Sequence, residues 1–356
     1  MSKLGFLAIG FAGALLLVGC GGTSDKITLV HEYAYVGNGD GIRQFEVASN
    51  GQLTPLAPAE VTATGVTTLA RSGNGKFLYA AAGKQDKVYQ YSIQKNGKLS
   101  PLSPASVTVA GPAAIATTPQ GYVYVLDTTH NSIAQFTTSD GALNAISPAS
   151  VPTVTDGNAL VATPDGKYLY AGGFSTHQID AYAIGVGGKL TPLPTASYDT
   201  GDNVTQLTVS PDGGSLFAGL DAGNIQQYGI NSDGSLDTNG VVATAGASPK
   251  GLAFTLDGRF AYQANLNAGQ AGSPVGQYSF NVASGNLTAL TPASIAAGNA
   301  PYGVAVNATS QFVYVTNVND GTVSQFAVNS DGTLSALSPD TLNVGPAAFD
   351  IVLARR

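Results

Sequence analysis

The sequence predicts an all-β fold, a seven-bladed β-propeller with four-stranded antiparallel blades, on three observations. Only 10% of the residues are charged, where soluble domains average about 25%, and there are 45 Gly and 18 Pro. One segment recurs seven times along the chain. Each recurrence has room for four short strands separated by turn residues. Few charges, many turn formers and a regular repeat are typical of a closed β architecture.

The repeat is defined by a Tyr-rich strand, exemplified by YAYVGN at 33–38 and FVYVTN at 312–317. A strand with Gln and an aromatic residue follows, such as TVSQFAV at 322–328, and a Gly-x-Leu step then begins another strand. The central aromatic positions of the seven Tyr-rich strands are Tyr35, Tyr79, Tyr124, Tyr170, Phe217, Tyr262 and Tyr314. Their spacings, from 44 to 52 residues, are typical of propeller blades.

The fourth strand of each blade is rich in small and aliphatic residues, as in GVAVNA at 303–308. Small side chains suit the innermost position, where seven strands crowd around one axis. The first such strand begins only near Val66, after a complete outer triad at 33–56. The terminal AAFDIVL at 347–353 is therefore predicted to be the innermost strand of that first blade. Closure of this kind leaves no free sheet edges at a seam.

The N-terminus has the pattern of an export signal. Lys3 precedes an apolar run from Leu4 to Val18, which is shorter than a typical transmembrane helix. It ends in LVGC at 17–20, which resembles the bacterial lipobox, with the thiol of Cys20 acylated after cleavage. We predict a lipoprotein signal peptide at 1–20, a tether at 21–30 and the propeller at 31–356. An ordinary secretory signal with an incidental cysteine is the alternative.

Lipidation of Cys20 predicts an exported protein attached to a membrane by its acyl chains, at the outer membrane, in the periplasm or on the cell surface. Cys20 is the only cysteine, so the mature domain would contain no thiol. We expect no metal and no cofactor. A net charge of −7 and a pI near 4.8 argue against a nucleic-acid partner. We expect a monomer.

Several motifs resemble the lactonase family of seven-bladed propellers, the 6-phosphogluconolactonase-like proteins, and the related YVTN repeats of surface proteins. They are YVTN at 314–317, the repeated Pro-Asp-Gly turns and the ending GPAAFDIVL at 345–353. The resemblance covers residues 31–356.

The resemblance implies a catalytic His at the start of one inner strand and an Arg-His pair at the start of the next. The matching positions in this sequence are Asn158, Thr205 and Gln206, none of which titrates. Ester hydrolysis needs a base and a group that stabilises the oxyanion. The neutral residues therefore weigh against catalysis, and the catalytic residues stay unassigned.

Polar residues in the loops that lead into the inner strands are candidates for ligand binding, because these loops open on one face of the disc. Those expected nearest the axis are Asp156, Asn158, Asp202, Asn203, Lys250 and Tyr302. Together they would suit a carbohydrate, a small molecule or a protein at the mouth of the channel. Taken singly, each is explained as a turn residue.

Two histidines, His130 and His177, occupy equivalent loops of adjacent blades on the same face. With Asp127 they would offer ligands for Zn²⁺. Their spacing does not define a metal site, and exposed loop residues are the favoured interpretation. They remain ligand-binding candidates.

Two functions follow from the sequence. The favoured one is a binding or structural module that uses the channel mouth to hold a partner, a carbohydrate or a small molecule. The alternative is a lactonase that opens a sugar lactone or another lactone.

Overall fold

The computed structural model describes residues 31–244, 248–266 and 274–356. The predicted signal peptide, Cys20 and the tether lie outside these residues. Within them, no helix is long and apolar enough to cross a membrane.

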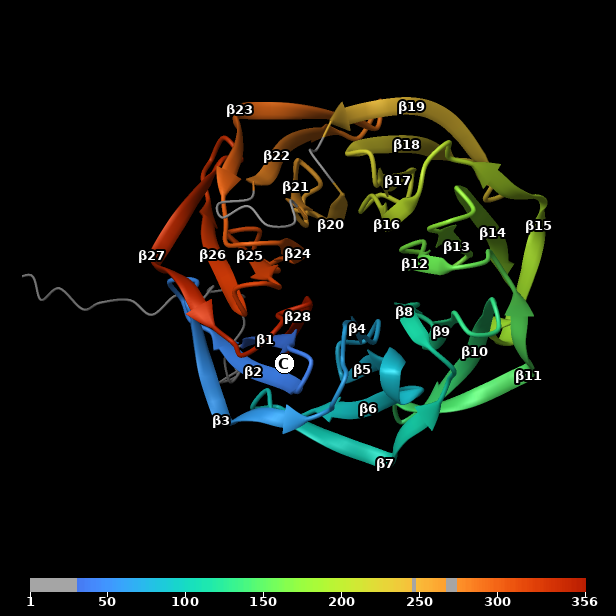
Figure 1. Cartoon of the computed structure of the whole chain (residues 1–356), viewed down its shortest axis with the longest axis horizontal. Helices are drawn as coiled ribbons and strands as arrows, with labels where there is room; N and C mark the ends of the chain where they lie inside the picture. Colours follow the sequence, from blue (N-terminus) through green and yellow to red (C-terminus); the bar gives the residue numbers. More distant parts are fainter. Residues whose placement is uncertain (1–30, 245–247, 267–273) are drawn as a thin grey trace, which may run out of the picture.

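Seven four-stranded antiparallel sheets surround a central opening, which confirms the predicted fold class (Figure 1). The innermost strands, in chain order, are β4 (Thr68–Arg71), β8 (Pro112–Thr117), β12 (Gly157–Ala162), β16 (Val204–Val209), β20 (Pro249–Phe254), β24 (Pro301–Val306) and β28 (Asp350–Arg355). The second strands are β1 (Glu32–Gly37), β5 (Phe77–Ala82), β9 (Tyr122–Asp127), β13 (Tyr168–Gly173), β17 (Ser215–Leu220), β21 (Phe260–Asn265) and β25 (Phe312–Asn317).

The outer half of each blade completes the sheet. The third strands are β2 (Gly41–Val47), β6 (Lys87–Ile93), β10 (Ser132–Ser139), β14 (Gln178–Ile184), β18 (Asn224–Ile230), β22 (Pro274–Asn281) and β26 (Thr322–Val328). The outermost strands are β3 (Leu53–Thr62), β7 (Leu99–Thr108), β11 (Ala142–Pro152), β15 (Leu190–Asp199), β19 (Leu236–Thr244), β23 (Asn286–Ala296) and β27 (Leu334–Asn343). Two short 3-10 turns, η1 (Gly83–Gln85) and η2 (Val186–Gly188), interrupt the pattern.

The second strands form the core because a neighbouring blade covers each of their faces. Five consecutive residues of β1 are buried, and β5, β9, β13, β21 and β25 show the same pattern. Because both faces of these strands are buried, their apolar residues are consecutive and do not alternate with polar ones. The inner strands pack closely at Gly303, where an added Cβ would lie 3.1 Å from Cα of Asp350.

The C-terminal strand closes the ring as predicted. β28 pairs antiparallel with β1 from Glu32 opposite Arg355 to Gly37 opposite Asp350, and it lies between β24 and β4 in the inner ring (Figure 1). It begins three residues later than the sequence indicated, because the chain before it is irregular and Ala347 has a φ of 56°.

The repeated tyrosines join six of the seven blades to the blade that follows. Their buried hydroxyls donate to the carbonyl of the glycine in the Gly-x-Leu step of the following blade, at 2.5–2.8 Å. The pairs are Tyr35 with Gly97, Tyr79 with Gly141, Tyr124 with Gly188, Tyr170 with Gly234, Tyr262 with Gly332 and Tyr314 with Gly51. Each bond satisfies a hydroxyl that has been removed from water.

The repeated glutamines make a second link. In five blades the side-chain carbonyl of a third-strand Gln accepts the backbone N–H of the Gly-x-Leu leucine in the next blade, at 2.5–2.9 Å. Its amide donates to the carbonyl of a cis proline in its own blade. These residues are Gln44, Gln90, Gln135, Gln277 and Gln325. The Gln residues that repeat in the sequence thus tie neighbouring blades together.

One seam lacks both links. Between the β16–β19 and β20–β23 blades, Phe217 replaces the tyrosine, and the amide of Gln227 donates to Ser215 within its own blade. An aromatic cluster fills this seam: the ring centroid of Phe217 lies 5.5 Å from that of Phe254 and 5.8 Å from that of Phe280. Apolar packing replaces hydrogen bonds at this seam.

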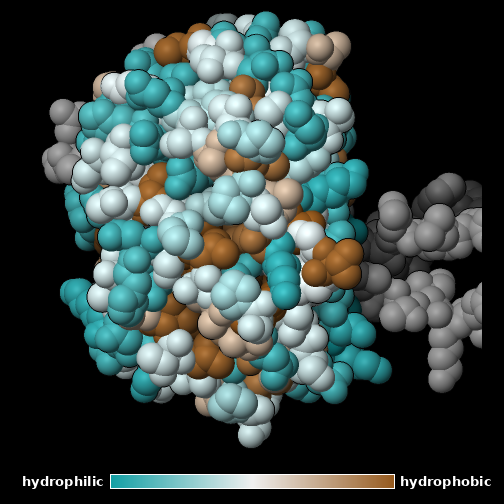
Figure 2. Space-filling view, turned by 90° about the vertical axis from the view of Figure 1, so that its right-hand side faces the viewer, coloured by the Kyte–Doolittle hydropathy of each residue, from teal (hydrophilic) through white to brown (hydrophobic). Residues whose placement is uncertain are grey.

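The edge of the disc that faces the viewer in Figure 2 is mostly hydrophilic or neutral. Figure 2 shows its apolar atoms in several separate groups among polar ones, over the edge where β11, β15 and β19 lie. Single exposed apolar side chains, such as Val186 and Val241, are ordinary on protein surfaces.

Candidate functional site

The central opening has two ends, which we call the front mouth and the rear mouth. The seven inner strands begin at the front mouth and end at the rear mouth. A cavity of about 470 Å³ occupies the front mouth and is lined by the first residues of all seven inner strands. Its polar lining side chains are Thr67, Thr68, Asn158, Thr205, Gln206, Thr208, Lys250, Tyr302 and Asp350.

Strand register arranges most of this lining in two rings. Aligning the inner strands on the central aromatic position of each second strand places Lys250, Tyr302 and Phe349 at equivalent positions. Asp350 lies one residue further, level with Gly251 and Gly303. Gly251 and Gly303 have no side chain, so the two preceding blades leave space beside the Asp350 carboxyl at this level.

A lysine and two aromatic rings form one side of the cavity. Lys250 Nζ lies 5.9 Å from the ring centroid of Tyr302, a distance at which the ring attracts the ammonium. Tyr302 in turn packs edge-on against Phe349, at 6.1 Å between centroids. Burial lowers the pKa of Lys250, and the more distant Asp221 carboxylate opposes this effect. Burial also raises the pKa of the Tyr302 phenol, with a further contribution from Asp350.

Asp350 supplies the carboxylate of the cavity. Burial raises its pKa to about 6, although two backbone amides act in the opposite direction. Leu69 N donates to Oδ2 and Ile351 N donates to Oδ1, both at 2.8 Å. These bonds fix the carboxylate between the first and last inner strands. Each oxygen retains a further lone pair for a ligand or a water molecule.

The three positions that correspond to the family's His and Arg-His residues also lie in this cavity. Asn158 donates to the carbonyls of Val204 and Thr205 on the next inner strand, at 3.3 Å each. The Thr205 hydroxyl is used in bonds to backbone carbonyls. The Gln206 amide nitrogen is buried and has no partner among the described residues. These side chains join inner strands or offer hydrogen bonds, and none supplies a charge.

Of the six residues predicted to surround the front mouth, the structure brings three into the cavity: Asn158, Lys250 and Tyr302. The other three, Asp156, Asp202 and Asn203, lie in the loops before the inner strands and do not line it.

The two loop carboxylates hold turns together. The Ser175 hydroxyl donates to Asp156, while Ala222 N and Asn203 N donate to Asp202 at 2.7 and 2.8 Å. Irregular loops place these side chains outside the cavity lining, a displacement that residue spacing alone does not reveal.

His130 and His177 are both exposed in loops on the front face. His130 Nδ1 lies 2.9 Å from Oδ2 of Asp127, and its backbone N–H donates to the other oxygen of the same carboxylate. His177 adopts a φ of 53°. Among the residues that the structure describes, no group of three or more His, Cys, Asp and Glu side chains has the geometry to hold a metal ion.

Sequence reasoning missed Asp350. It stands in AAFDIVL, which was interpreted only as the closing strand. An available signal was its place in the repeat, because it is the one ionisable residue at a position otherwise held by Thr68, Ala114, Ala159, Gln206, Gly251 and Gly303.

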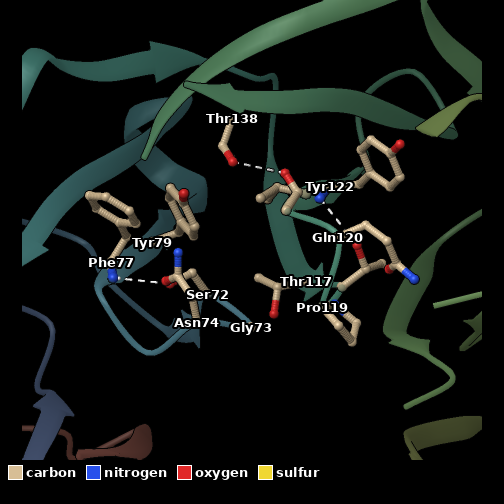
Figure 3. Close-up of a pocket in the computed structure, with 13 residues that line it drawn as sticks. Ser72, Gly73, Asn74, Phe77, Tyr79, Thr117, Pro119, Gln120, Tyr122 and Thr138 are labelled. Atoms are coloured by element: carbon tan, nitrogen blue, oxygen red, sulfur yellow. Dashed lines mark hydrogen bonds between the residues drawn. The ribbon is translucent and has the colours of Figure 1, made fainter. Parts of the chain in front are cut away.

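A smaller hollow of about 140 Å³ lies on the rear face between the β4–β7 and β8–β11 blades (Figure 3). Its hydroxyls already serve the local turns. The Ser72 hydroxyl accepts Phe77 N at 3.0 Å, and the Thr118 hydroxyl accepts Tyr122 N at 3.1 Å. The Thr138 hydroxyl donates to the Gly121 carbonyl at 2.9 Å. This hollow is a by-product of two hairpin turns.

Comparison with known proteins gives a family match over part of the chain. The family model described as "Lactonase, 7-bladed beta-propeller" matches residues 100–197. The 6-phosphogluconolactonase of Serratia proteamaculans is 24% identical over 228 residues, which is 52% of this chain and 68% of that protein. Human serum paraoxonase/arylesterase 1 is 30% identical over 91 residues, 24% of this chain and only 25% of that protein.

Solved structures share the fold over nearly the whole chain. A putative 6-phosphogluconolactonase from Bacteroides fragilis superposes with a TM-score of 0.79 at 20% identity, covering 91% of this chain and 98% of that one. A periplasmic gluconolactonase of Pseudomonas aeruginosa gives a TM-score of 0.73 at 19% identity, with 91% and 99% covered. The resemblance carried by YVTN, the Pro-Asp-Gly turns and the closing strand is thereby confirmed: the lactonase model matches residues 100–197, 6-phosphogluconolactonases are similar over about half of the chain, and the seven-bladed fold is shared over 91% of it.

Proposed function

We propose that this protein hydrolyses a lactone in the front-mouth cavity. The observation that carries the proposal is that one cavity of the propeller is lined both by the Asp350 carboxylate, whose pKa burial raises to about 6, and by the partly desolvated ammonium of Lys250. Homology to 6-phosphogluconolactonases favours this function over the binding or structural module that the sequence alone favoured. The residues that carry it differ from those that the family resemblance implied.

The Asp350 carboxylate suits the role of general base. A carboxyl with a pKa near 6 is mostly ionised at pH 7 and is more basic than an ordinary aspartate. It would take a proton from water as the water oxygen bonds to the lactone carbonyl carbon. When the ring C–O bond breaks, the same proton passes to the departing alkoxide. The immediate product is the open hydroxy acid, whose carboxyl group keeps the second proton of the water and then releases it to solvent, and Asp350 is again ionised.

Lys250 suits the role of oxyanion stabiliser. Negative charge develops on the carbonyl oxygen as water attacks, and a cation in a partly water-excluded cavity stabilises it strongly. The Tyr302 ring, 5.9 Å from Nζ, restricts where the ammonium can lie. Asn158 and Gln206 line the same cavity with neutral polar side chains, which suit the hydroxyl groups of a sugar lactone.

The test is hydrolysis of a panel of sugar, aliphatic and aromatic lactones by the purified chain. We expect turnover of at least one sugar lactone. We expect Asp350→Asn to lower kcat by about 100-fold or more, because loss of a general base typically costs that much. Lys250→Gln is expected to lower kcat by about 10- to 100-fold. Below about pH 6 the wild-type rate is expected to fall as Asp350 becomes protonated.

Asp180→Asn is the matched control. Burial also raises the pKa of Asp180, but this residue lies on β14, outside the cavity, so its variant is expected to keep wild-type kcat. Failure of the wild type to hydrolyse any lactone would contradict the proposal, and so would equal rates in wild type and Asp350→Asn.

Binding without turnover is the second candidate, favoured by the neutral side chains at Asn158, Thr205 and Gln206. In that case sugars or their open acids would bind the front mouth, and the same panel would show affinity but no hydrolysis. Lys250→Gln would then weaken binding of the acids more than binding of the neutral sugars.

We further propose that acylated Cys20 anchors the propeller to a membrane on the exported side of the cell. The support is the lipobox-like LVGC at 17–20. We expect Cys20→Ser to release the protein from the membrane fraction when it is expressed in a bacterium, with the propeller still folded. Retention of the variant in that fraction at the wild-type level would contradict lipid anchoring.

A further inference from the structure

The rear mouth of the opening holds a cavity of its own, of about 220 Å³. It spans the ends of four neighbouring inner strands, β20, β24, β28 and β4, which lie together around the central opening (Figure 1). It shares no lining residue with the front-mouth cavity. Neither the family match nor the proposed hydrolysis assigns it a role.

Two arginines converge on this cavity from adjacent blades. Arg71 ends β4, and Arg355 lies near the end of β28. Among the described residues, no carboxylate oxygen lies within 4.0 Å of either guanidinium. Although part of Arg71 is exposed, nearby atoms displace enough water to lower the pKa of its guanidinium. A partly desolvated cation without a close counter-ion favours the binding of an anion.

One carboxylate limits the charge of that anion. Glu32 also lines the cavity, where its Oε1 accepts Ala308 N at 2.9 Å. Its negative charge acts on Arg71 from beyond ion-pair distance. The cavity therefore carries two positive charges and one negative charge. This balance suits a singly charged group better than a dianion such as phosphate.

The remaining wall is apolar. Phe254, Val306 and Leu353 line the cavity, and Leu256 stands at it with 70% of its surface exposed. An exposed leucine in a cavity that two arginines also line offers a contact for a short hydrocarbon chain. The small volume excludes long chains, because pockets for drug-sized ligands measure about 300 Å³ or more.

We propose that the rear mouth binds a short-chain organic carboxylate, with its carboxylate between Arg71 and Arg355 and its alkyl chain against Phe254 and Leu256. Arginine is suited to this contact because its planar fork donates two parallel hydrogen bonds to a carboxylate. The site is independent of the proposed hydrolysis, which uses the opposite mouth.

The experiment titrates the full chain with hexanoate, acetate and inorganic phosphate by calorimetry. We expect saturable binding of hexanoate, with at least about tenfold weaker binding of acetate and of phosphate. Arg71→Gln and Arg355→Gln are each expected to weaken hexanoate binding by about tenfold or more. Leu256→Ser is expected to weaken it by several-fold, while acetate binding stays unchanged.

Glu32→Gln provides a test that misfolding cannot imitate. The glutamine keeps an oxygen that can accept Ala308 N, but it removes the opposing charge, so hexanoate is expected to bind about threefold more tightly. Lys84→Gln removes an exposed cation far from the cavity and is the control, with wild-type affinity expected. The proposal is overturned if hexanoate does not bind, if phosphate binds more tightly, or if the Arg71 and Arg355 variants keep wild-type affinity.

Discussion

Deleting residues 346–356 is expected to abolish cooperative folding of the propeller. The deletion removes β28, so β1 loses its inner neighbour and exposes an unpaired edge in the middle of the ring. It also removes the buried side chains of Ala348, Ile351 and Ala354, and the bond from Leu69 N to Asp350. Six of the seven inner strands would remain, and the ring would be left with an open seam. Unpaired edges of this kind promote association between chains.

The measurement is thermal unfolding together with size-exclusion chromatography. We expect the truncated chain to show no sharp transition and to elute as oligomers. A truncated monomer that melts like the full chain would contradict the closure model.

A rearranged chain separates the loss of β28 from the loss of a covalent end. His31 and Arg356 exchange backbone hydrogen bonds, N to O at 3.1 Å and 2.9 Å. These two residues of the propeller are therefore adjacent, so in a chain that lacks residues 1–30, residues 346–356 can be placed before His31 through a two-residue Asn-Gly turn. This permuted chain, which begins at 346 and ends at 345, is expected to regain a sharp transition and monomeric elution, because β28 and β1 become a hairpin.

The sequence predicted the fold well because two features of the repeat, its period and its small residues, both indicate the strand order of a blade. The period placed Tyr35 and its six equivalents on the second strands, and the small residues marked the inner strands. Closure followed from the order of elements, since an unmatched outer triad at the start required an unmatched inner strand at the end. All of these inferences depend on local patterns that recur, so an error at one blade is corrected by the others.

The site was harder to predict because it is built from positions where the blades differ. Lys250 and Tyr302 were recognised from their place just before an inner strand. Asp350 was not recognised, because its carboxyl acquires its raised pKa only when other strands bury it, and the opposing hydrogen bond from Leu69 N also comes from another strand. Asp202 was expected near the axis but binds backbone amides of its own loops instead. Loop geometry and contacts across the ring decide these cases, and neither is periodic.

The glutamine link between blades also combines a feature that the sequence reveals with one that it does not. The recurrence of Gln44 and its equivalents was visible in the sequence, but their partner is a backbone N–H of the next blade, about 55 residues along the chain. The sequence also contains the exception, Phe217 in place of tyrosine. Only the structure shows that an aromatic cluster with Phe254 and Phe280 replaces the missing hydrogen bonds there.

The second large effect is expected at the glycine of the Gly-x-Leu step. Gly141 has a φ of +84°, and a Cβ added there would lie 2.1 Å from Cδ1 of Phe77 on the preceding blade. Its carbonyl also accepts the Tyr79 hydroxyl at 2.8 Å. Gly141→Ala must therefore shift either the Phe77 ring or the turn that places this carbonyl. We expect the free energy of unfolding to fall by about 4 kcal/mol.

Gly240 provides the matched comparison. Its φ of +87° is nearly the same, but no atom lies within 4 Å of an added Cβ. Gly240→Ala thus carries only the cost of a left-handed backbone, about 1 kcal/mol. In thermal unfolding we expect roughly a 10 °C decrease for Gly141→Ala and roughly 2 °C for Gly240→Ala. Equal decreases would show that backbone conformation, and not contact between blades, determines the need for glycine at Gly141.

A double variant tests the contact itself. Phe77→Ala removes the ring that the new methyl group would strike, at the cost of a cavity between two blades. Combined with Gly141→Ala, the loss of stability is expected to be smaller than the sum of the two single losses by about 2 kcal/mol. The same ring-over-glycine contact recurs at Gly51, Gly97, Gly188, Gly234 and Gly332. Non-additivity at Gly141 would therefore establish a packing rule for six of the seven seams, and the seventh, at Phe217, is the one where the tyrosine link is absent. Strict additivity would instead mean that the ring and the glycine contribute to stability independently.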